Sequence, residues 1–152
     1  MNRITQIATV LVIVGLIIWL ALPIYGDYTP RVSVSAAIVY TVDIKSALDA
    51  ACSEGTFESK QRLTDLGKPN SDPKAYTYRA ELSHLAQNSA RLKAYLSDIY
   101  AHPFFGLIPW KVVSQGRFLE FEFTCTADRK FSSRFIGSDL EPKYLPASLR
   151  GS

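Results

Sequence analysis

An uncharged and strongly apolar run near the start of the chain constrains the fold more than any other feature. From Ile4 to Gly26 the sequence contains no Asp, Glu, Lys or Arg. A helix of about 23 residues is about 34 Å long, which is enough to cross the hydrocarbon core of a bilayer. The run therefore predicts a membrane-spanning helix within residues 1–26, followed by a head formed by residues 27–152.

Two other interpretations of the run are a cleaved signal peptide and the core helix of a soluble domain. A signal peptide has a shorter apolar core and small residues before its cleavage site, whereas this run is long and ends in Ala-Leu-Pro-Ile-Tyr. A core helix this apolar does not suit so small a soluble domain. The amino terminus and Arg3 precede the run, while Asp27 and Arg31 nearly cancel after it, which favours a cytoplasmic N-terminus and an external head.

The apolar run passes without a linker into a second segment with helical periodicity. Apolar side chains recur there at spacings of three and four, and no glycine lies between Asp27 and Ala51. The spacing predicts a helix with one apolar stripe. Pro23 and Pro30 each lack a backbone N–H, so we expect one kinked, continuous helix that ends near Gly55. The stripe consists of Tyr28, Val32, Ala36, Val39 and Val42.

The middle of the chain reads as a loop followed by a second helix. Residues 59–75 are polar and contain one glycine and two prolines, which is typical of an exposed loop. Six residues beyond it are then spaced three and four apart. This spacing predicts an additional amphipathic helix from about Arg79 to Tyr100, closed by Pro103. The six residues are Leu82, Leu85, Ser89, Leu92, Leu96 and Ile99.

The period changes to two in the last third of the chain, which predicts a small antiparallel sheet. In residues 117–126, "RFLEFEFTCT", apolar and polar side chains alternate, as in a half-buried strand. The stretch "WKVVSQGRF", residues 110–118, is expected to supply a partner strand through a turn near Gln115 and Gly116. A third strand is expected in "KFSSRFI", residues 130–136. The fold class predicted from these patterns is α+β.

The two cysteines occupy positions from which they could meet. Cys52 lies near the end of the long helix, and Cys125 lies on the apolar face of its strand. If the helix packs on the sheet, a disulfide between them closes a loop of roughly 70 residues and contributes about 4 kcal/mol in the chain-entropy model. The alternative is two buried free thiols.

Residues that could support catalysis or metal binding are scattered. His84, His102 and the two cysteines show no zinc-type spacing, and the Glu120/Glu122 pair falls on the polar side of a strand. No phosphate-binding glycine loop or nucleophile elbow is present in the sequence. We therefore expect no enzymatic activity, no cofactor and no metal. The function is expected to lie in surfaces and in the membrane helix.

The junction between the two helical segments resembles that of a known family. Residues 20–38, "LALPIYGDYTPRVSVSAAI", resemble the region of type IV pilins where the membrane half of the long N-terminal helix becomes amphipathic. The tail "PKYLPASLR", residues 142–150, is similar to the "KYLPASCR" tail of many pilins. The resemblance implies a spine helix packed on a small antiparallel sheet. It also implies that Gly15, Pro23, Tyr25 and Tyr28 take part in spine-helix packing.

The resemblance implies a structural role. It implies a subunit of a type IV pilus or related filament, with a role in adhesion, motility or DNA uptake. The implied partners are pilin subunits, contacted through the N-terminal helix, the inner membrane and the pilus assembly machinery. The implied location is the inner membrane with a periplasmic head, or an extracellular pilus.

Several positions depart from the pilin pattern. Met1, Asn2 and Gln6 stand where pilins carry glycine, phenylalanine and glutamate, which leaves processing by prepilin peptidase and polymerisation open. The alternative is a non-polymerising accessory or chaperone that stays in the inner membrane and binds pilins. Leu149 replaces the usual cysteine of the tail, which leaves Cys52 as the partner for Cys125.

Basic residues near the C-terminus raise a third possibility, a DNA receptor. The net charge of +3 is small, and exposed lysines and arginines are usually just solvated. DNA is therefore the least expected partner. The residues that would contact it are Arg129, Lys130, Arg134, Lys143 and Arg150.

Overall fold

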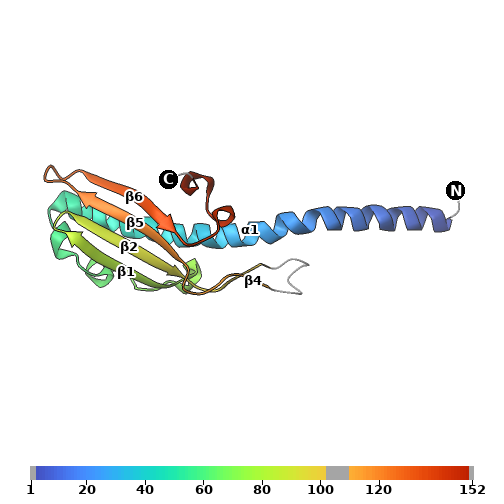
Figure 1. Cartoon of the computed structure of the whole chain (residues 1–152), viewed down its shortest axis with the longest axis horizontal. Helices are drawn as coiled ribbons and strands as arrows, with labels where there is room; N and C mark the ends of the chain where they lie inside the picture. The colour runs from blue at the N-terminus through green and yellow to red at the C-terminus, as the bar shows by residue number, and fades with distance from the viewer. Residues whose placement is uncertain (1–2, 102–109, 151–152) are drawn as a thin grey trace.

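The computed structural model describes residues 3–101 and 110–150, and within residues 21–27 it describes the backbone alone. One long helix, α1 (Arg3–Glu54), carries a head on its C-terminal half, while its N-terminal half projects away from the head (Figure 1). The head contains a four-stranded antiparallel sheet that lies against α1. In spatial order the strands are β1 (Thr77–Ala86), β2 (Ser89–Leu96), β5 (Phe118–Cys125) and β6 (Phe131–Ser138).

Shorter elements complete the head. A two-stranded antiparallel ribbon consists of β3 (Ile99–Ala101) and β4 (Trp110–Val113). Three 3-10 turns follow the helix and two follow the sheet. They are η1 (Phe57–Ser59), η2 (Leu63–Leu66), η3 (Pro73–Ala75), η4 (Pro142–Tyr144) and η5 (Ala147–Leu149).

α1 runs through both prolines without a break, so the predicted continuity of the helix is confirmed, and its kink stays a prediction. The helix ends because Gly55 adopts a φ of +75°, a left-handed conformation that favours glycine. The N–H groups beyond the last turn then bond back into the helix. That of Gly55 donates to the Cys52 carbonyl at 3.1 Å, and that of Thr56 donates to the Ala51 carbonyl at 2.8 Å.

One face of the C-terminal half of α1 packs on the sheet and forms the core. Its buried side chains recur every three or four residues and meet inward-facing residues of β2 and β5, including Leu92, Leu119 and Phe123. The sequence predicted one apolar stripe on this part of the helix, but the helix has two. The buried stripe consists of Val34, Ala37, Thr41, Ile44 and Leu48, and the predicted stripe lies on the opposite side.

The additional amphipathic helix predicted from about Arg79 to Tyr100 is wrong. This segment forms β1 and β2, joined by a two-residue turn at Gln87 and Asn88, and then β3. Burial in β2 alternates strictly, because two alanines share the inner face with two leucines. The three-and-four spacing appeared only because the leucines were counted without the alanines. The inner-face residues of β2 are Ala90, Leu92, Ala94 and Leu96.

The strand prediction for the last third is confirmed for β5 and β6 and wrong for the partner of β5. Gly116 does form a turn, with a φ of +97°, but β4 pairs with β3, while β5 pairs with β2 and β6. The Leu96 N–H donates to the Arg117 carbonyl at 2.7 Å. The turn therefore places the start of β5 beside the end of β2. The predicted loop over residues 59–75 contains η2 and η3, and Leu63 within it is buried rather than exposed.

Candidate assembly surface on the long helix

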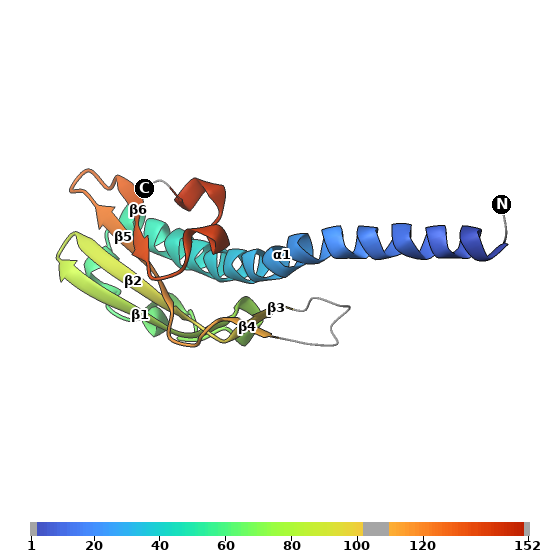
Figure 2. The same ribbon diagram turned by 45° about the vertical axis from the view of Figure 1, so that its right-hand side comes forward.

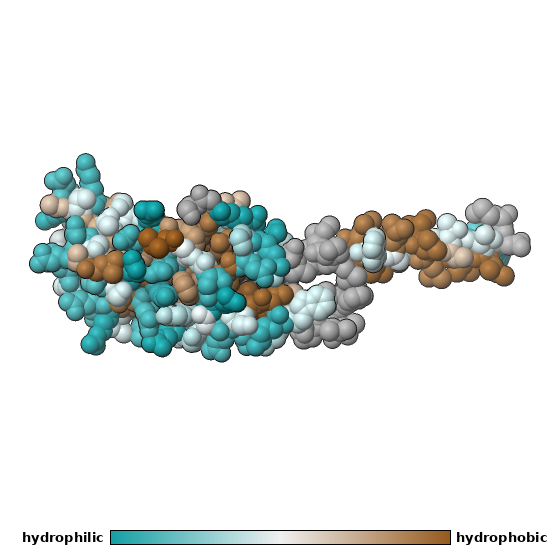
Figure 3. Space-filling model, viewed as in Figure 1, coloured by the Kyte–Doolittle hydropathy of each residue, from teal (hydrophilic) through white to brown (hydrophobic). Residues whose placement is uncertain are grey.

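The N-terminal half of α1 is an apolar surface that the rest of the molecule does not cover. Every residue from 3 to 20 is exposed. Among the described residues, the stretch Arg3–Leu20 has a mean hydropathy of 2.1 and is long and apolar enough to cross a bilayer. Figure 3 shows apolar side chains along this projecting part of the helix and polar side chains over most of the head. Such a surface needs lipid or other protein around it.

The stripe predicted from the sequence is a second exposed apolar surface, on the part of α1 that carries the head. Tyr28 is 64% exposed and Val39 is 62% exposed, and Val32 and Val42 are about as open to solvent. Their spacing places them on one side of α1, opposite the face that packs on the sheet. We call Tyr28, Val32, Val39 and Val42 the outward stripe.

The residues expected to pack the spine helix are distributed along this surface. Gly15 lies on the projecting half, with open space where a Cβ atom would be, so the helix backbone can be approached closely at that point. Tyr28 belongs to the outward stripe. Pro23 and Tyr25 fall within residues 21–27, so their side chains lie outside the described part of the chain.

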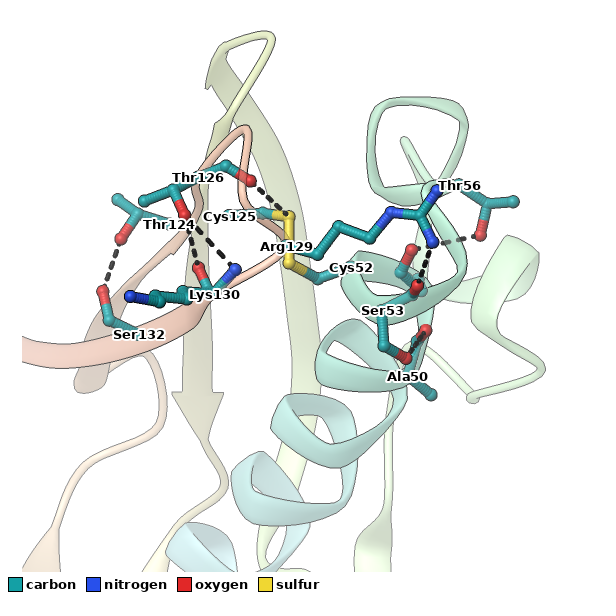
Figure 4. Close-up of a disulfide and its surroundings, with 11 residues drawn as sticks. Ala50, Cys52, Ser53, Thr56, Thr124, Cys125, Thr126, Arg129, Lys130 and Ser132 are labelled. Carbon is teal, nitrogen blue, oxygen red and sulfur yellow. Dashed lines mark hydrogen bonds between the residues drawn. A yellow bond between two sulfur atoms is a disulfide. The ribbon is translucent and has the colours of Figure 1, made fainter.

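At the far end of α1 the structure brings Cys52 and Cys125 together. Their Cα atoms lie 5.7 Å apart and their sulfur atoms form a disulfide that links the last turn of α1 to the end of β5 (Figure 4). The Cys52 side chain is fully buried. The bond fixes the helix to the sheet at the end of the head that is farthest from the projecting half.

Arg129 closes the end of α1 beside this disulfide. It lies in the turn between β5 and β6 with a φ of +58°, and its Nη1 donates a hydrogen bond of 3.1 Å to the Ser53 carbonyl (Figure 4). A cation at the C-terminal end of a helix satisfies free carbonyls and the negative end of the helix dipole. An open hollow of about 510 Å³ lies here, lined in part by Gly55, Glu58 and Arg129.

The five basic residues named as DNA contacts do not gather in one patch. Arg129 and Lys130 lie in the β5–β6 turn at one end of the head, whereas Lys143 and Arg150 lie in the C-terminal segment near the middle of α1 (Figure 1). Arg134 is on β6, in register with Glu122. Most of these cations also have partners within the chain. Lys143 pairs with a carboxylate at 2.8 Å, and Arg150 donates to a backbone carbonyl at 2.8 Å.

The C-terminal segment is tied to α1 near the end of the head from which the projecting half extends. The Nε of Arg31 donates to the Lys143 carbonyl at 2.8 Å, and Tyr144 and Leu145 pack in the same core cluster as Val34. A hydrogen bond to Glu141 raises the pKa of Lys143, as does its contact with Tyr144. Sequence reasoning did not identify this tie, because the residues lie 112 positions apart and neither carries a motif.

Titratable groups elsewhere in the head serve packing. Burial raises the pKa of Tyr40, with a further contribution from the negative charge of Asp72, and the Tyr40 hydroxyl donates to the Pro69 carbonyl. The ring of His84 donates to the Lys60 carbonyl at 2.8 Å. His102 lies outside the described residues.

No arrangement of these groups suggests reaction chemistry. Within residues 3–101 and 110–150, no group of three or more His, Cys, Asp or Glu could hold a metal ion. Glu120 lies 3.4 Å from Arg91 and its side chain is only 16% exposed, so an ion pair holds this carboxylate on a partly covered face rather than on the open solvated face that the sequence predicts. The surface that stands out is therefore the exposed side of α1, which can bind lipid or other helices.

Comparison with known proteins gives one match that spans nearly the whole chain. The chain is 25% identical to the type IV major pilin protein PilE1 of Neisseria gonorrhoeae, over 155 aligned positions that cover 95% of this chain and 90% of that protein. No family model matches the chain, and no solved structure matches it. A pilin is a structural protein, which is consistent with the expectation that this chain is not an enzyme. The match and the α+β architecture together support a pilin-like relationship for the chain.

Proposed function

We propose that the protein is a membrane-anchored, pilin-like subunit that joins a type IV pilus or a related filament through α1. In this proposal residues 1–26 lie in the inner membrane and residues 27–152 form a periplasmic head. The observation that carries it is that one unbroken helix, α1, bears both the exposed apolar side chains of residues 3–20 and the exposed outward stripe. The similarity to a major pilin supports the same role.

The energetics favour association of such a surface with other helices. Full burial of a valine side chain contributes about 1.5 to 3 kcal/mol relative to its exposed state. Val32, Val39 and Val42 are each about half exposed or more, so a neighbouring helix could cover them and gain several such increments, offset in part by the entropy of association. The projecting half would exchange lipid for neighbouring helices when the subunit enters a filament.

A second candidate role is an accessory that binds pilins and stays in the membrane. The observation that favours it is Gln6, which stands where pilins carry a glutamate. Gln6 can donate and accept hydrogen bonds but supplies no charge for a neighbour's terminal amine. We do not propose a DNA receptor, because the basic residues lie at separate places on the head.

Fractionation of the native protein distinguishes the two roles. A subunit that assembles should appear in extracellular filaments removed from cells by shearing, whereas an accessory should remain in the inner membrane. Gln6→Glu tests the same point, because a carboxylate could make a charge-assisted contact with a neighbour's amine in a low-dielectric filament core. Native protein in sheared filaments at a normal pilin ratio would exclude the accessory role. Native protein confined to the membrane, together with no effect of Gln6→Glu, would exclude the filament role.

A further inference from the structure

The two-stranded ribbon β3–β4 extends from the head in the direction of the projecting half of α1. Figures 1 and 2 both show β4 leaving the sheet and running beside α1 toward its N-terminal half. The root of the ribbon is fixed, because Ile99 and Val113 pack in the core cluster that contains Val34 of α1. The described ends of the ribbon, Ala101 and Trp110, are therefore at the membrane-proximal end of the head.

Two large aromatic side chains on this ribbon are open to solvent. Trp110 is 50% exposed and Tyr100 is 40% exposed. Trp110 is in register with Ala101, which is fully buried, so the indole lies on the face of the ribbon that packs on α1, just beyond the head.

The level of the bilayer surface follows from α1. The uncharged run ends at Gly26, and Pro30 is already buried in the head. The distance between these two residues is about 6 Å along the helix axis, at about 1.5 Å per residue. A bilayer that surrounds the apolar run therefore reaches close to the membrane-proximal end of the head, where Trp110 lies.

We propose that the β3–β4 ribbon is a second membrane contact, with Trp110 and Tyr100 resting in the interface of the leaflet from which α1 emerges. Tryptophan and tyrosine are enriched at that depth because an apolar ring and a polar N–H or O–H suit the boundary between acyl chains and water. The proposal rests on the membrane anchoring of the proposed function. It adds a contact that fixes the tilt and rotation of the head relative to the bilayer.

Lipid fits this surface better than a second copy of the chain. The ribbon and the apolar run point to the same end of the molecule, so a single bilayer surface can meet both. The nearest charged pair keeps its charges satisfied within the chain, because Lys111 Nζ lies 2.8 Å from the Asp98 carboxylate. Lys111 Nζ also lies 5.9 Å from the centre of the Tyr100 ring, so Tyr100 lies beside this pair, and Trp110 is the main apolar side chain that the ribbon presents to lipid.

The two tryptophans of the chain allow a direct test, because Trp19 lies in the apolar run and Trp110 lies on the ribbon. The full chain is reconstituted in phosphatidylethanolamine and phosphatidylglycerol vesicles that contain lipids with a spin-label quencher at a shallow or a deep position. Trp19→Phe leaves Trp110 as the sole tryptophan, and Trp110→Phe leaves Trp19. A matched control carries Leu85→Trp with both native tryptophans replaced by Phe, because Leu85 is 49% exposed near the distal end of the head.

We expect Trp110 to lose fluorescence mainly with the shallow label, Trp19 to lose it with the deep label, and the Leu85→Trp control to lose none. Quenching of Trp19 without quenching of Trp110 would overturn the ribbon contact and leave the helix anchor intact. Quenching of neither would overturn both. A Trp110 emission that is blue-shifted but insensitive to lipid labels would assign the ribbon to contact with another protein chain and would also overturn the proposal.

Discussion

The two halves of α1 are equally helical but have different surroundings. Residues 3–20 expose every side chain, whereas the half that carries the head buries one face and exposes the other. The buried face meets β2 and β5, and the outward stripe meets nothing within the described chain. The head therefore covers one side of the helix and leaves the other side open. The uncovered side and the projecting half belong to the same unbroken helix.

The largest expected effect is on the stability of the head, after removal of the disulfide. Replacing both Cys52 and Cys125 with Ser removes a cross-link between residues 73 positions apart, which should lower the free energy of unfolding of the head by about 4 kcal/mol in the chain-entropy model. Membrane association should not change, because the projecting half lies far from the bond. Chemical denaturation of the variant measures the loss. Mass mapping of the native protein without reductant should recover the two cysteines linked, and recovery of both thiols free would contradict this prediction.

The two faces of the head half should respond differently to the same truncation. Leu48→Ala removes a fully buried side chain and should cost about 3 to 4 kcal/mol of stability through lost burial and a residual cavity. Val39→Ala removes an exposed one and should cost no more than about 0.5 kcal/mol. Paired denaturation curves test this. Equal losses would mean that the outward stripe is covered within the isolated subunit.

A charge in the projecting half tests its environment without touching the head. Val14→Arg places a charge near the middle of the apolar run, at a cost of about 2.5 to 3.5 kcal/mol on the insertion scale. We expect the variant to leave the membrane fraction while its head keeps native denaturation behaviour. Unchanged membrane fractionation would argue against a spanning role for this half.

The smallest expected effect is on the pH dependence of stability, at Asp98 beside the ribbon. Hydrogen bonds from Lys111 and from the Gln115 N–H lower the pKa of Asp98 below its ordinary value of 3.8. A carboxyl with a lowered pKa in the folded state stabilises the fold above the unfolded pKa, and this contribution is lost as the pH falls through the folded value. Asp98→Asn should therefore melt slightly below the native protein at pH 7. The difference should begin to shrink as the pH falls below about 3.8 and should vanish only below the lowered folded pKa of Asp98, and a difference that does not shrink on acidification would contradict the assignment.

The sequence predicted the elements with a long or uninterrupted pattern. The continuous α1, its end near Gly55 and the strand β5 follow from local signals, namely helical periodicity without a break, a glycine and a period of two, and β6 follows from a short stretch of aromatic and serine residues. The hairpin β1–β2 was missed because its alternation depends on Ala90 and Ala94. Alanine has a high helix propensity, so these two residues did not indicate a strand. The ribbon β3–β4 was missed because strand partners depend on contacts between distant residues.

In the candidate site too, features with a local sequence pattern could be predicted, and features that depend on tertiary contacts could not. The outward stripe could be identified from its spacing, but spacing alone does not say which of two apolar faces a head will cover. The capping role of Arg129 and the tie from Arg31 to Lys143 depend on tertiary contacts across 76 and 112 residues. No local pattern in the sequence encodes either contact.

A single pair of variants tests most directly whether the outward stripe is the assembly surface. Val39→Glu places a carboxylate in the middle of the stripe, and Lys45→Gln makes the same change in net charge at an exposed position of α1 outside the stripe. The measurement is the amount of each variant in sheared filaments, relative to the native protein, with membrane levels as the reference. We expect Val39→Glu to be folded and present in the membrane but missing from filaments, and Lys45→Gln to assemble normally. Val39→Glu in filaments at the native level would contradict this expectation.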